Sequence, residues 1–357
     1  MLNYIVRRIL LMIPTVIGTT LLVFLVMALS PGGLAASFKN AEGSMRPEER
    51  KKIQEYYMKR YGLDQPLWKQ YLRWLNQVSP IGLKTHEDGS YGHVTFKWPD
   101  LGESFIRRRP VVDVFKETIP ITLLLNAISV PIIYSIAIVT GIYSAKKRGK
   151  TFDVATNIIY LALWSLPIMW VGVMMLGYLC NRDKLAWFPT GGLHDTLADT
   201  MPFFAHWTSD GFQRGWLLDV LWHLVLPVIC VSYSGFAFLA KLMRSSVLEN
   251  LNADFARTAR AKGLPENLVL FRHVLSNSLL PLITVAAYIL PGMLSGALIT
   301  EIIFSINGMG RLMVEAIMMK DREIVMSETL VVGIITLVSL LIADILYAVA
   351  DPRVTYD

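Results

Sequence analysis

Charged side chains are scarce in this sequence. Only 17% of its 357 residues are Asp, Glu, Lys or Arg, whereas 54% are hydrophobic. An average soluble domain carries about 25% charged residues, so this composition points to a membrane protein. The net charge of +6 is spread along the chain. Because no basic stripe with interleaved aromatic residues appears, nucleic acid is not an expected partner.

Cysteine and catalytic patterns are also scarce. Cys180 and Cys230 both fall inside apolar runs, where we expect small hydrophobic residues and neither a disulfide nor a metal site. The sequence contains neither HExxH nor GxSxG, and the spacing of its six histidines suggests no haem or metal site. GKT at 149–151 lacks the earlier glycine of a phosphate-binding loop, because residue 144 is serine. We therefore expect no catalytic residue, no bound metal or cofactor, and no ATPase site in this chain.

Long apolar runs, in contrast, recur along the chain. A helix needs about 20 apolar residues to cross about 30 Å of hydrocarbon, and proline or glycine within such a run does not rule it out. The first run is longer than the apolar core of a signal peptide, so we expect it to be retained. The predicted fold class is all-α, a polytopic membrane protein with six transmembrane helices near residues 9–29, 119–143, 155–180, 219–243, 279–304 and 329–350.

The distribution of Lys and Arg predicts the orientation. With the N-terminus in the cytoplasm, the short inner segments carry thirteen Lys and Arg residues and the two short outer loops carry six. Cytoplasmic loops carry the excess of positive charge, so both termini are expected in the cytoplasm. The predicted segments are a transmembrane helix at 1–30, a large extracytoplasmic segment at 31–117, a transmembrane core at 118–350 and a cytoplasmic tail at 351–357.

The extracytoplasmic segment contains an amphipathic pattern. In PLWKQYLRWLNQV, residues 66–78, apolar residues recur at helical spacing. The preceding residues 47–62 predict another helix that ends at Gly62. These helices form either an external docking surface for a partner or an amphipathic layer on the bilayer surface. Residues 80–100 show no clear period and are predicted to form a loop.

Two acidic residues fall within or beside the predicted spans. Glu301 lies near the outer end of the fifth span, and Asp344 lies in the sixth. Ionisable groups in spans often serve function, but a proton relay needs such groups close together in mid-membrane. These two fall near opposite faces, which favours hydrogen bonding inside the helix bundle and argues against a proton-driven carrier.

A polar, basic insert separates the fourth and fifth spans at about 244–278. Gly263 is suited to end one short helix, and Pro265 is suited to the first turn of another. The insert, whose net charge over 241–273 is +3, is predicted to form a helix–turn–helix knob that fits a groove on a cytosolic partner, or a surface helix on anionic lipid headgroups. Its apolar faces would consist of Leu251, Phe255 and Ala259, and of Leu268, Phe271 and Leu275, with Arg257, Arg260, Lys262 and Arg272 at the rim.

The insert also carries a family resemblance. ARTARAKG at 256–263, followed by Asn277-x-x-Leu280-Pro281, resembles the coupling loop of binding-protein-dependent ABC transporter permeases of the dipeptide/oligopeptide/nickel family. The chain looks most like the oligopeptide permeases of Gram-negative bacteria. The resemblance leaves out only about 80–98 and 194–215. Further matches are YIVRRILLMIPT at 4–15, SPGG at 30–33, RYGLDQPLWKQYLRWL at 60–75, LGESF-x-x-RRP at 101–110, AWFPTGG at 186–192, LWHLVLPV at 221–228, FSINGMGRL at 304–312 and DPR at 351–353.

The resemblance implies a subunit of an ATP-driven importer in the bacterial cytoplasmic (inner) membrane. This chain would form a heterodimer with a second, homologous permease. It would bind two cytosolic ABC ATPases, which hold ATP and Mg²⁺, and receive solute from an extracytoplasmic solute-binding protein. Peptides are the leading substrates, and nickel complexes and oligosaccharides stay open. The competing functions are an ion- or proton-coupled secondary transporter and a membrane enzyme.

The resemblance also implies site residues. Solute would pass between the paired permeases near Asn126, Trp164 and Glu301, which are polar or amphipathic groups in or near spans. Pro265 stands where the family often has a serine that caps the second helix. The residues implied to form the ATPase-coupling loop are Phe255, Arg257, Thr258, Ala259, Arg260, Ala261, Lys262, Gly263, Leu264 and Pro265.

Overall fold

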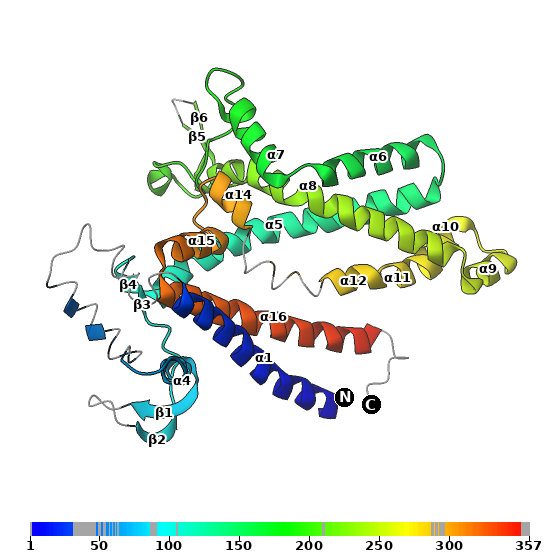
Figure 1. Cartoon of the computed structure of the whole chain (residues 1–357). Coiled ribbons are helices and arrows are strands. Elements are labelled where there is room, and N and C mark those ends of the chain that lie inside the picture. Colours follow the sequence, from blue (N-terminus) through cyan, green and yellow to red (C-terminus); the bar gives the residue numbers. More distant parts are fainter. Residues whose placement is uncertain are drawn as a thin grey trace. The chain divides into compact units, whose positions relative to one another are not determined.

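A computed structural model of the chain describes residues 2–30, 64–85, 91–104, 106–208, 211–286 and 297–350, with a few positions between 48 and 62 and at 289 and 292. The chain forms two compact units, which are described in turn (Figure 1). One comprises Met1–Thr118, Leu312–Leu341 and Asp351–Asp357, and the other comprises Ile119–Arg311 and Ile342–Ala350. The predicted tail at 351–357, half of the residues of the predicted helix at 47–62, and residues 287, 288, 290, 291 and 293–296 of the predicted fifth span lie outside the described residues.

The first unit combines the first and last long helices with the segment that follows the first helix. Its elements are α1 (Leu2–Leu29), α4 (Leu67–Val78), β1 (Ile81–Thr85), β2 (Tyr91–Phe96), β3 (Glu103–Ser104), β4 (Arg109–Pro110), the first residues of α5 (Val111–Lys146), and most of α15 (Met309–Met319) and α16 (Arg322–Ala350).

An amphipathic helix packs against the first span in this unit. Tyr71, Trp74 and Val78 of α4 share one helical face and are buried against α1 and α16. The Tyr71 hydroxyl donates a hydrogen bond to the Ile17 carbonyl oxygen at 2.9 Å and lies 2.9 Å from the Thr20 hydroxyl. The helix predicted over 66–78 is therefore present, and one of its faces is buried in protein.

The segment predicted as a loop at 80–100 contains a β-hairpin. β1 pairs antiparallel with β2, with Ile81 opposite Phe96. Asn76 at the end of α4 holds the first strand, since its side chain donates to the Leu83 carbonyl and accepts from the Leu83 amide. Two further two-stranded sheets, β3–β4 and β5–β6, occur among the described residues. The all-α prediction was therefore incomplete, because side-chain anchors such as Asn76 create strands that periodicity over so few residues does not reveal.

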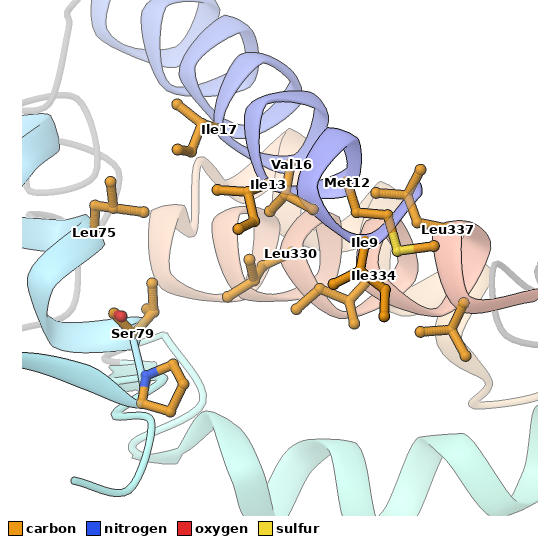
Figure 2. Close-up of a pocket in the computed structure, with 13 residues that line it drawn as sticks. Ile9, Met12, Ile13, Val16, Ile17, Leu75, Ser79, Leu330, Ile334 and Leu337 are labelled. Carbon is orange, nitrogen blue, oxygen red and sulfur yellow. The ribbon is translucent and has the colours of Figure 1, made fainter. Parts of the chain in front are cut away.

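An apolar groove of about 390 Å³ runs between α1, α4 and α16. Figure 2 shows its lining side chains, with Ile9 to Ile17 along one helix and Leu330 to Leu337 along another. Ser79 is the one polar side chain in the lining. The surface of the groove is hydrophobic, as expected where helix faces meet hydrocarbon.

Buried polar contacts join the outer segment of this unit to the start of α16. The Arg60 guanidinium lies 2.6 Å from the Asp100 carboxylate and 3.3 Å from that of Glu323. The Ser104 hydroxyl donates to the Asp321 carboxylate, and burial raises the pKa of that carboxyl. These contacts account for the LGES motif, because it supplies the backbone and hydroxyl groups that face Asp321 and Glu323.

The second unit is a helical bundle with a short hairpin at one end. Besides the rest of α5, its elements are α6 (Thr151–Ser165), α7 (Ile168–Met175), η2 (Leu176–Cys180), η3 (Ala198–Thr200), β5 (His206–Thr208), β6 (Gly211–Gln213), α8 (Trp216–Leu251), α9 (Asp254–Ala261), α10 (Glu266–Leu268), η4 (Val269–Val274), α11 (Leu275–Ser278), α12 (Leu280–Ala286) and α14 (Leu298–Ile303).

Close packing of α5 on α8 forms the centre of this bundle. A Cβ atom added to Gly141 of α5 would lie 2.7 Å from the Cβ of Met243 and 2.9 Å from the Ala240 carbonyl oxygen, so only glycine permits this approach. Cys180 and Cys230 are buried in the apolar cluster at the other end of the same helices, and both are free thiols. They act as small hydrophobic residues, as their apolar surroundings predicted.

The predicted third span, 155–180, is bent. α6 and the α7–η2 helix meet at 90°, at the Leu166–Pro167 step. Proline lacks an amide hydrogen and disfavours helical geometry in the residue before it, and Leu166 is extended at φ −78° and ψ 124°. The Tyr233 hydroxyl donates to the freed Leu166 carbonyl at 2.7 Å. The break is therefore caused by proline and satisfied by a neighbouring helix.

Within the described residues, five helices are long and apolar enough to cross a membrane, and the number rises to six when the bent pair counts as one crossing. The first, second, fourth and sixth predicted spans coincide with α1, α5, α8 and α16. The fifth differs, because its described part, Glu266–Ala286, begins thirteen residues before the predicted start. The second half of the basic insert thus continues directly into this span.

The turn between α5 and α6 is held by a buried carboxylate. Asp153 is 3% exposed and accepts two hydrogen bonds from Arg244 of α8, at 2.6 and 2.8 Å. It also accepts bonds from the Ser144 hydroxyl, the Gly149 amide and the Asn157 side chain. This residue therefore ties three helices together at the end that leads into the insert.

Replacing Asp153 with Asn should destabilise the protein strongly. Removing one partner of a buried ion pair leaves the other uncompensated and typically costs about 3–5 kcal/mol. Asp113→Asn is the matched control, because Asp113 pairs with the well exposed Lys116 and such pairs contribute about 0–1 kcal/mol. Thermal unfolding of the purified protein should show a much larger fall in Tm for Asp153→Asn, and equal Tm values would contradict the assignment.

Candidate functional site

The basic insert forms a compact helix–turn–helix at one end of the second unit (Figure 1). α9 ends at Ala261 and is closed by Gly263, whose φ of +79° is the left-handed conformation that glycine adopts without steric cost. The Gly263 amide donates to the Arg260 carbonyl and the Leu264 amide to the Ala259 carbonyl, which is the Schellman pattern of a helix C-terminus. Pro265 immediately precedes α10, one residue earlier than the predicted first-turn position.

Small residues let this motif lie flat on the bundle. Ala256 and Ala259 of α9 are 0% and 5% exposed and pack in one cluster with Met243 and Val247 of α8 and Ile142 of α5. Because alanine side chains are short, the α9 backbone lies close to the helices beneath it. α9 is therefore in direct packing contact with the long helices of the bundle.

The apolar residues of the second helix are arranged differently from the prediction. Val269, Leu270 and Val274 are buried in the same cluster, whereas Leu268 and Phe271 are 38% and 56% exposed. The cause is η4, because its π-helical turn is wider than an α-turn and rotates the residues along it. Leu268 and Phe271 consequently contribute to the outer surface of the motif and not to its attachment.

The outer surface of the motif combines apolar and basic side chains. Phe255 is 39% exposed, and Arg257, Lys262 and Arg272 are also exposed. The residues from Ala261 to Pro265 are exposed apart from the half-buried Leu264. A Cβ atom at Gly263 would meet nothing within 4 Å. The turn is therefore a thin projection whose surroundings, within this chain, are open.

Arg260 stabilises the motif from within. Its guanidinium donates to both carboxylate oxygens of Glu266, at 3.0 and 2.9 Å, and to the Leu251 carbonyl at 3.0 Å. The bonds to Glu266 raise the pKa of the Arg260 guanidinium. Arg260 was predicted to lie at the rim of the insert. In the structure its side chain instead links α9 to α8 and α10. Lys146 at the end of α5 adds a bond of 2.9 Å to Asn267.

A second polar cluster lies at the opposite end of the bundle, around Glu301 of α14. The Glu301 carboxylate is fully buried and accepts from the Thr122 hydroxyl at 3.1 Å and from the Ala297 and Arg311 amides at 3.2 and 2.9 Å. Thr122 in turn accepts from the Met309 amide at 2.8 Å. Two side chains thus cap the first amides of α15, which the chain would otherwise leave unbonded.

This cluster explains the FSINGMGRL motif. A Cβ atom at Gly308 would lie 2.5 Å from the Glu301 carboxyl carbon and from Thr122 Oγ1, and one at Gly310 would lie 2.7 Å from the Leu298 Cα. Ser305 has a positive φ of 52°. The two glycines are therefore required because the loop closes tightly over the buried carboxylate.

The predicted pathway residues fall into two places. Asn126 is 8% exposed and donates to the Thr122 carbonyl at 2.9 Å, so it lies one helical turn from the Glu301 cluster. Trp164, on α6, is 58% exposed. Asn126 and Glu301 are thus connected by their hydrogen bonds to Thr122. Trp164 lies on a separate, exposed surface. Their role in solute passage stays a prediction.

Several residues that hold the bundle together were not predicted from the sequence. Thr122, Gly308 and the Asp153–Arg244 pair organise the two ends of the bundle, yet none stood out by composition or spacing. Glycines in the 304–312 motif were the available signal for Gly308, since two glycines close together indicate a tight backbone approach. Among the described residues, no group of three His, Cys, Asp or Glu side chains is arranged to hold a metal ion.

Comparison with known proteins covers nearly the whole chain. Residues 137–356 match the family model "Binding-protein-dependent transport system inner membrane component", and residues 1–126 match its N-terminal counterpart. The chain belongs to this family. It is a multi-pass inner membrane component, in agreement with its apolar helices.

Individual relatives agree along their full lengths. The chain is 33% identical to the oligopeptide transport system permease protein AppB of Bacillus subtilis, over 99% of each chain. It is also 33% identical to the di/tripeptide transport system permease protein DppB of Pseudomonas aeruginosa, over 100% of this chain and 99% of the relative. The dipeptide transport system permease protein DppB of Escherichia coli is 32% identical over the same shares. The predicted family membership is confirmed.

Replacing Gly308 with alanine should destabilise this inner membrane component. The added methyl group would overlap the buried Glu301 and Thr122 side chains, and overpacking of a buried site typically costs about 1–3 kcal/mol. Gly333→Ala in α16 is the matched control, because a Cβ there meets nothing within 4 Å and alanine favours helix. Thermal unfolding should show a lower Tm for Gly308→Ala alone; an unchanged Tm would mean that the loop is not tightly closed.

Proposed function

We propose that this chain is a translocation subunit of an ATP-driven ABC importer for peptides. It would pair with a second permease as a heterodimer, bind two cytosolic ATPases that hold ATP and Mg²⁺, and accept solute from an extracytoplasmic binding protein. The oligopeptide and dipeptide relatives support the substrate class. In this proposal the chain hydrolyses no ATP and has both termini in the cytoplasm.

The observation that carries the proposal is the outward projection of the turn at Gly263. The exposed segment 261–265 has open space around it, while Ala256 and Ala259 on the opposite side of the motif are buried against α8 and α5. A partner that binds the turn and moves would therefore move α5 and α8 together. The Arg260–Glu266 ion pair would keep α9 and α10 together during that movement.

The basic residues of this end of the bundle support the proposed orientation. Lys146, Lys147, Arg148 and Lys150 lie in the α5–α6 turn, and the Lys146–Asn267 bond places that turn beside the insert. Short cytoplasmic loops carry an excess of Lys and Arg. The two loops therefore form one basic surface that would face the ATPases.

The orientation predicts which cysteines react from outside the cell. Thr95 on β2 and Ser245 on α8 are both exposed in the structure, but only Thr95 belongs to the proposed extracytoplasmic segment. In intact cells, an impermeant maleimide should label Thr95→Cys and not Ser245→Cys, whereas both should react after the membrane is permeabilised. Labelling of Ser245→Cys alone in intact cells would reverse the proposed orientation.

Valine at position 263 should uncouple the importer. A non-glycine residue in left-handed geometry is disfavoured by about 1–2 kcal/mol, and a β-branched side chain would also widen the turn at its thinnest point. We expect Gly263→Val to abolish peptide uptake and to release or uncouple the ATPases, while membrane insertion is retained. Arg272→Ala, at the exposed rim, should have a small effect because peripheral contacts carry little binding energy.

Gly149 supplies the matched control for this experiment. It lies in the α5–α6 turn with a φ of +74°, and a Cβ there also meets nothing within 4 Å. Gly149→Val therefore introduces similar backbone strain without altering the coupling turn. Uptake that fails equally in both variants would indicate strain alone, and normal uptake in Gly263→Val with ATPases bound would refute the coupling role.

A further inference from the structure

The stretch at 200–213 carries exposed aromatic side chains that the proposed function does not explain. It belongs to the part of the chain that the family resemblance leaves out. Phe203, Phe204, Trp207 and Phe212, here called the aromatic edge, are 53%, 69%, 79% and 50% exposed. The stretch contains no Lys, Arg or Glu and a single Asp. Exposed apolar surface of this kind marks contact with a membrane or a protein partner.

The aromatic edge is attached to the first turn of α8. The Trp216 amide donates to the Pro202 carbonyl at 2.8 Å and the Leu217 amide to the Phe203 carbonyl at 3.0 Å. The rings of Phe203 and Trp216 stack with centroids 5.7 Å apart. Gly215 touches the Phe204 backbone so closely that any Cβ would collide with it. The position of α8 along the membrane normal therefore sets the position of residues 202–204.

The charges of α8 determine that position. Asp219 and Lys241 enclose twenty-one residues without a charge, Val220 to Ala240. At 1.5 Å per residue these span about 31 Å, which matches the roughly 30 Å of the hydrocarbon core. Trp216 lies one helical turn beyond Asp219, about 5 Å outside the hydrocarbon. The headgroup layer adds about 5–7 Å on each side, which places the attached residues 202–204 at the depth of this layer.

Neighbouring aromatic residues lie at the edge of the hydrocarbon core beside this layer. Phe188 stacks on Trp222 with centroids 4.6 Å apart, and the Arg214 guanidinium lies 5.8 Å from the Trp222 ring centroid. Aromatic rings and basic side chains that extend toward the headgroups are typical of the membrane–water interface. The β5–β6 hairpin continues this belt, because Trp207 and Phe212 face each other across it with centroids 5.4 Å apart.

We propose that residues 201–208 and 211–213 form an interfacial anchor that inserts its aromatic edge into the outer-leaflet headgroup layer of the bilayer. That this is the outer leaflet rests on the orientation in the proposed function, whereas the depth of the segment in the bilayer rests on α8 alone. A lipid surface is favoured over a soluble partner because these aromatic side chains lie at a depth where lipid is always present. It also accounts for the lack of positive charge, since apolar insertion and not headgroup attraction would hold the segment.

Fluorescence quenching in lipid nanodiscs tests this anchor. Trp207→Cys and Phe212→Cys, each labelled with an environment-sensitive fluorophore, would be measured in the assembled transporter against spin-labelled phosphatidylcholine and aqueous iodide. Cys180 and Cys230 are buried and do not compete for the label. Thr95→Cys on β2, which is exposed in the structure, is the aqueous control. We expect blue-shifted emission and loss of emission with the spin-labelled lipid at positions 207 and 212, and quenching by iodide alone at position 95.

Two other outcomes would overturn the anchor. Quenching by iodide at 207 and 212 that disappears when the binding protein is added would identify a docking site for that protein. Protection from both quenchers in the complex, with exposure in the isolated chain, would identify a contact with the second permease. The measurement needs neither ATP nor substrate, so a failure of the proposed transport function would show in the Gly263→Val uptake assay and leave the quenching result unchanged.

Discussion

A bilayer cannot hydrogen-bond a backbone group that leaves its helix, and this constraint accounts for two helix breaks among the described residues. Each unsatisfied group in hydrocarbon costs several kcal/mol. Where Pro167 interrupts the third span, the hydroxyl of Tyr233 bonds the freed carbonyl. Where the chain turns into α15, the side chains of Thr122 and Glu301 accept hydrogen bonds from the Met309 and Arg311 amides. Irregular backbone therefore occurs where a side chain from another helix is available to satisfy it.

Buried side-chain contacts hold both ends of the bundle in the second unit. The end with the insert is held by Asp153 and Arg244, by the Arg260–Glu266 pair and by alanines packed flat on α8. The opposite end is held by Glu301. Between them, α5 and α8 approach at Gly141 with little room to slide independently. In the proposed coupling, a force on the turn at Gly263 would reach the far end through these two helices.

The sequence predicted local features well and distant ones poorly. Hydropathy identified the spans, and a glycine followed by a proline identified the turn of the insert, because both signals lie within a few neighbouring residues. The π-helical turn at 269–274 had no such signal and changed which side chains face the bundle. The 90° bend at Pro167 depends on a partner helix, and the β1 strand depends on Asn76. Glu301 was singled out as acidic, but its role depends on Thr122, 179 residues earlier.

That separation has a consequence for biosynthesis. At about 5–20 residues per second, roughly 10–35 s pass between the synthesis of Thr122 and that of its partner Glu301. The interval is longer for Ser104, because its partner Asp321 is synthesised 217 residues later. During this interval the polar groups of the early helices have no final partners and need water, the insertion machinery or temporary contacts. The helices of this chain are therefore expected to enter the membrane well before the bundle closes, and a chain truncated before the FSINGMGRL motif should be inserted yet remain open to quality-control proteases.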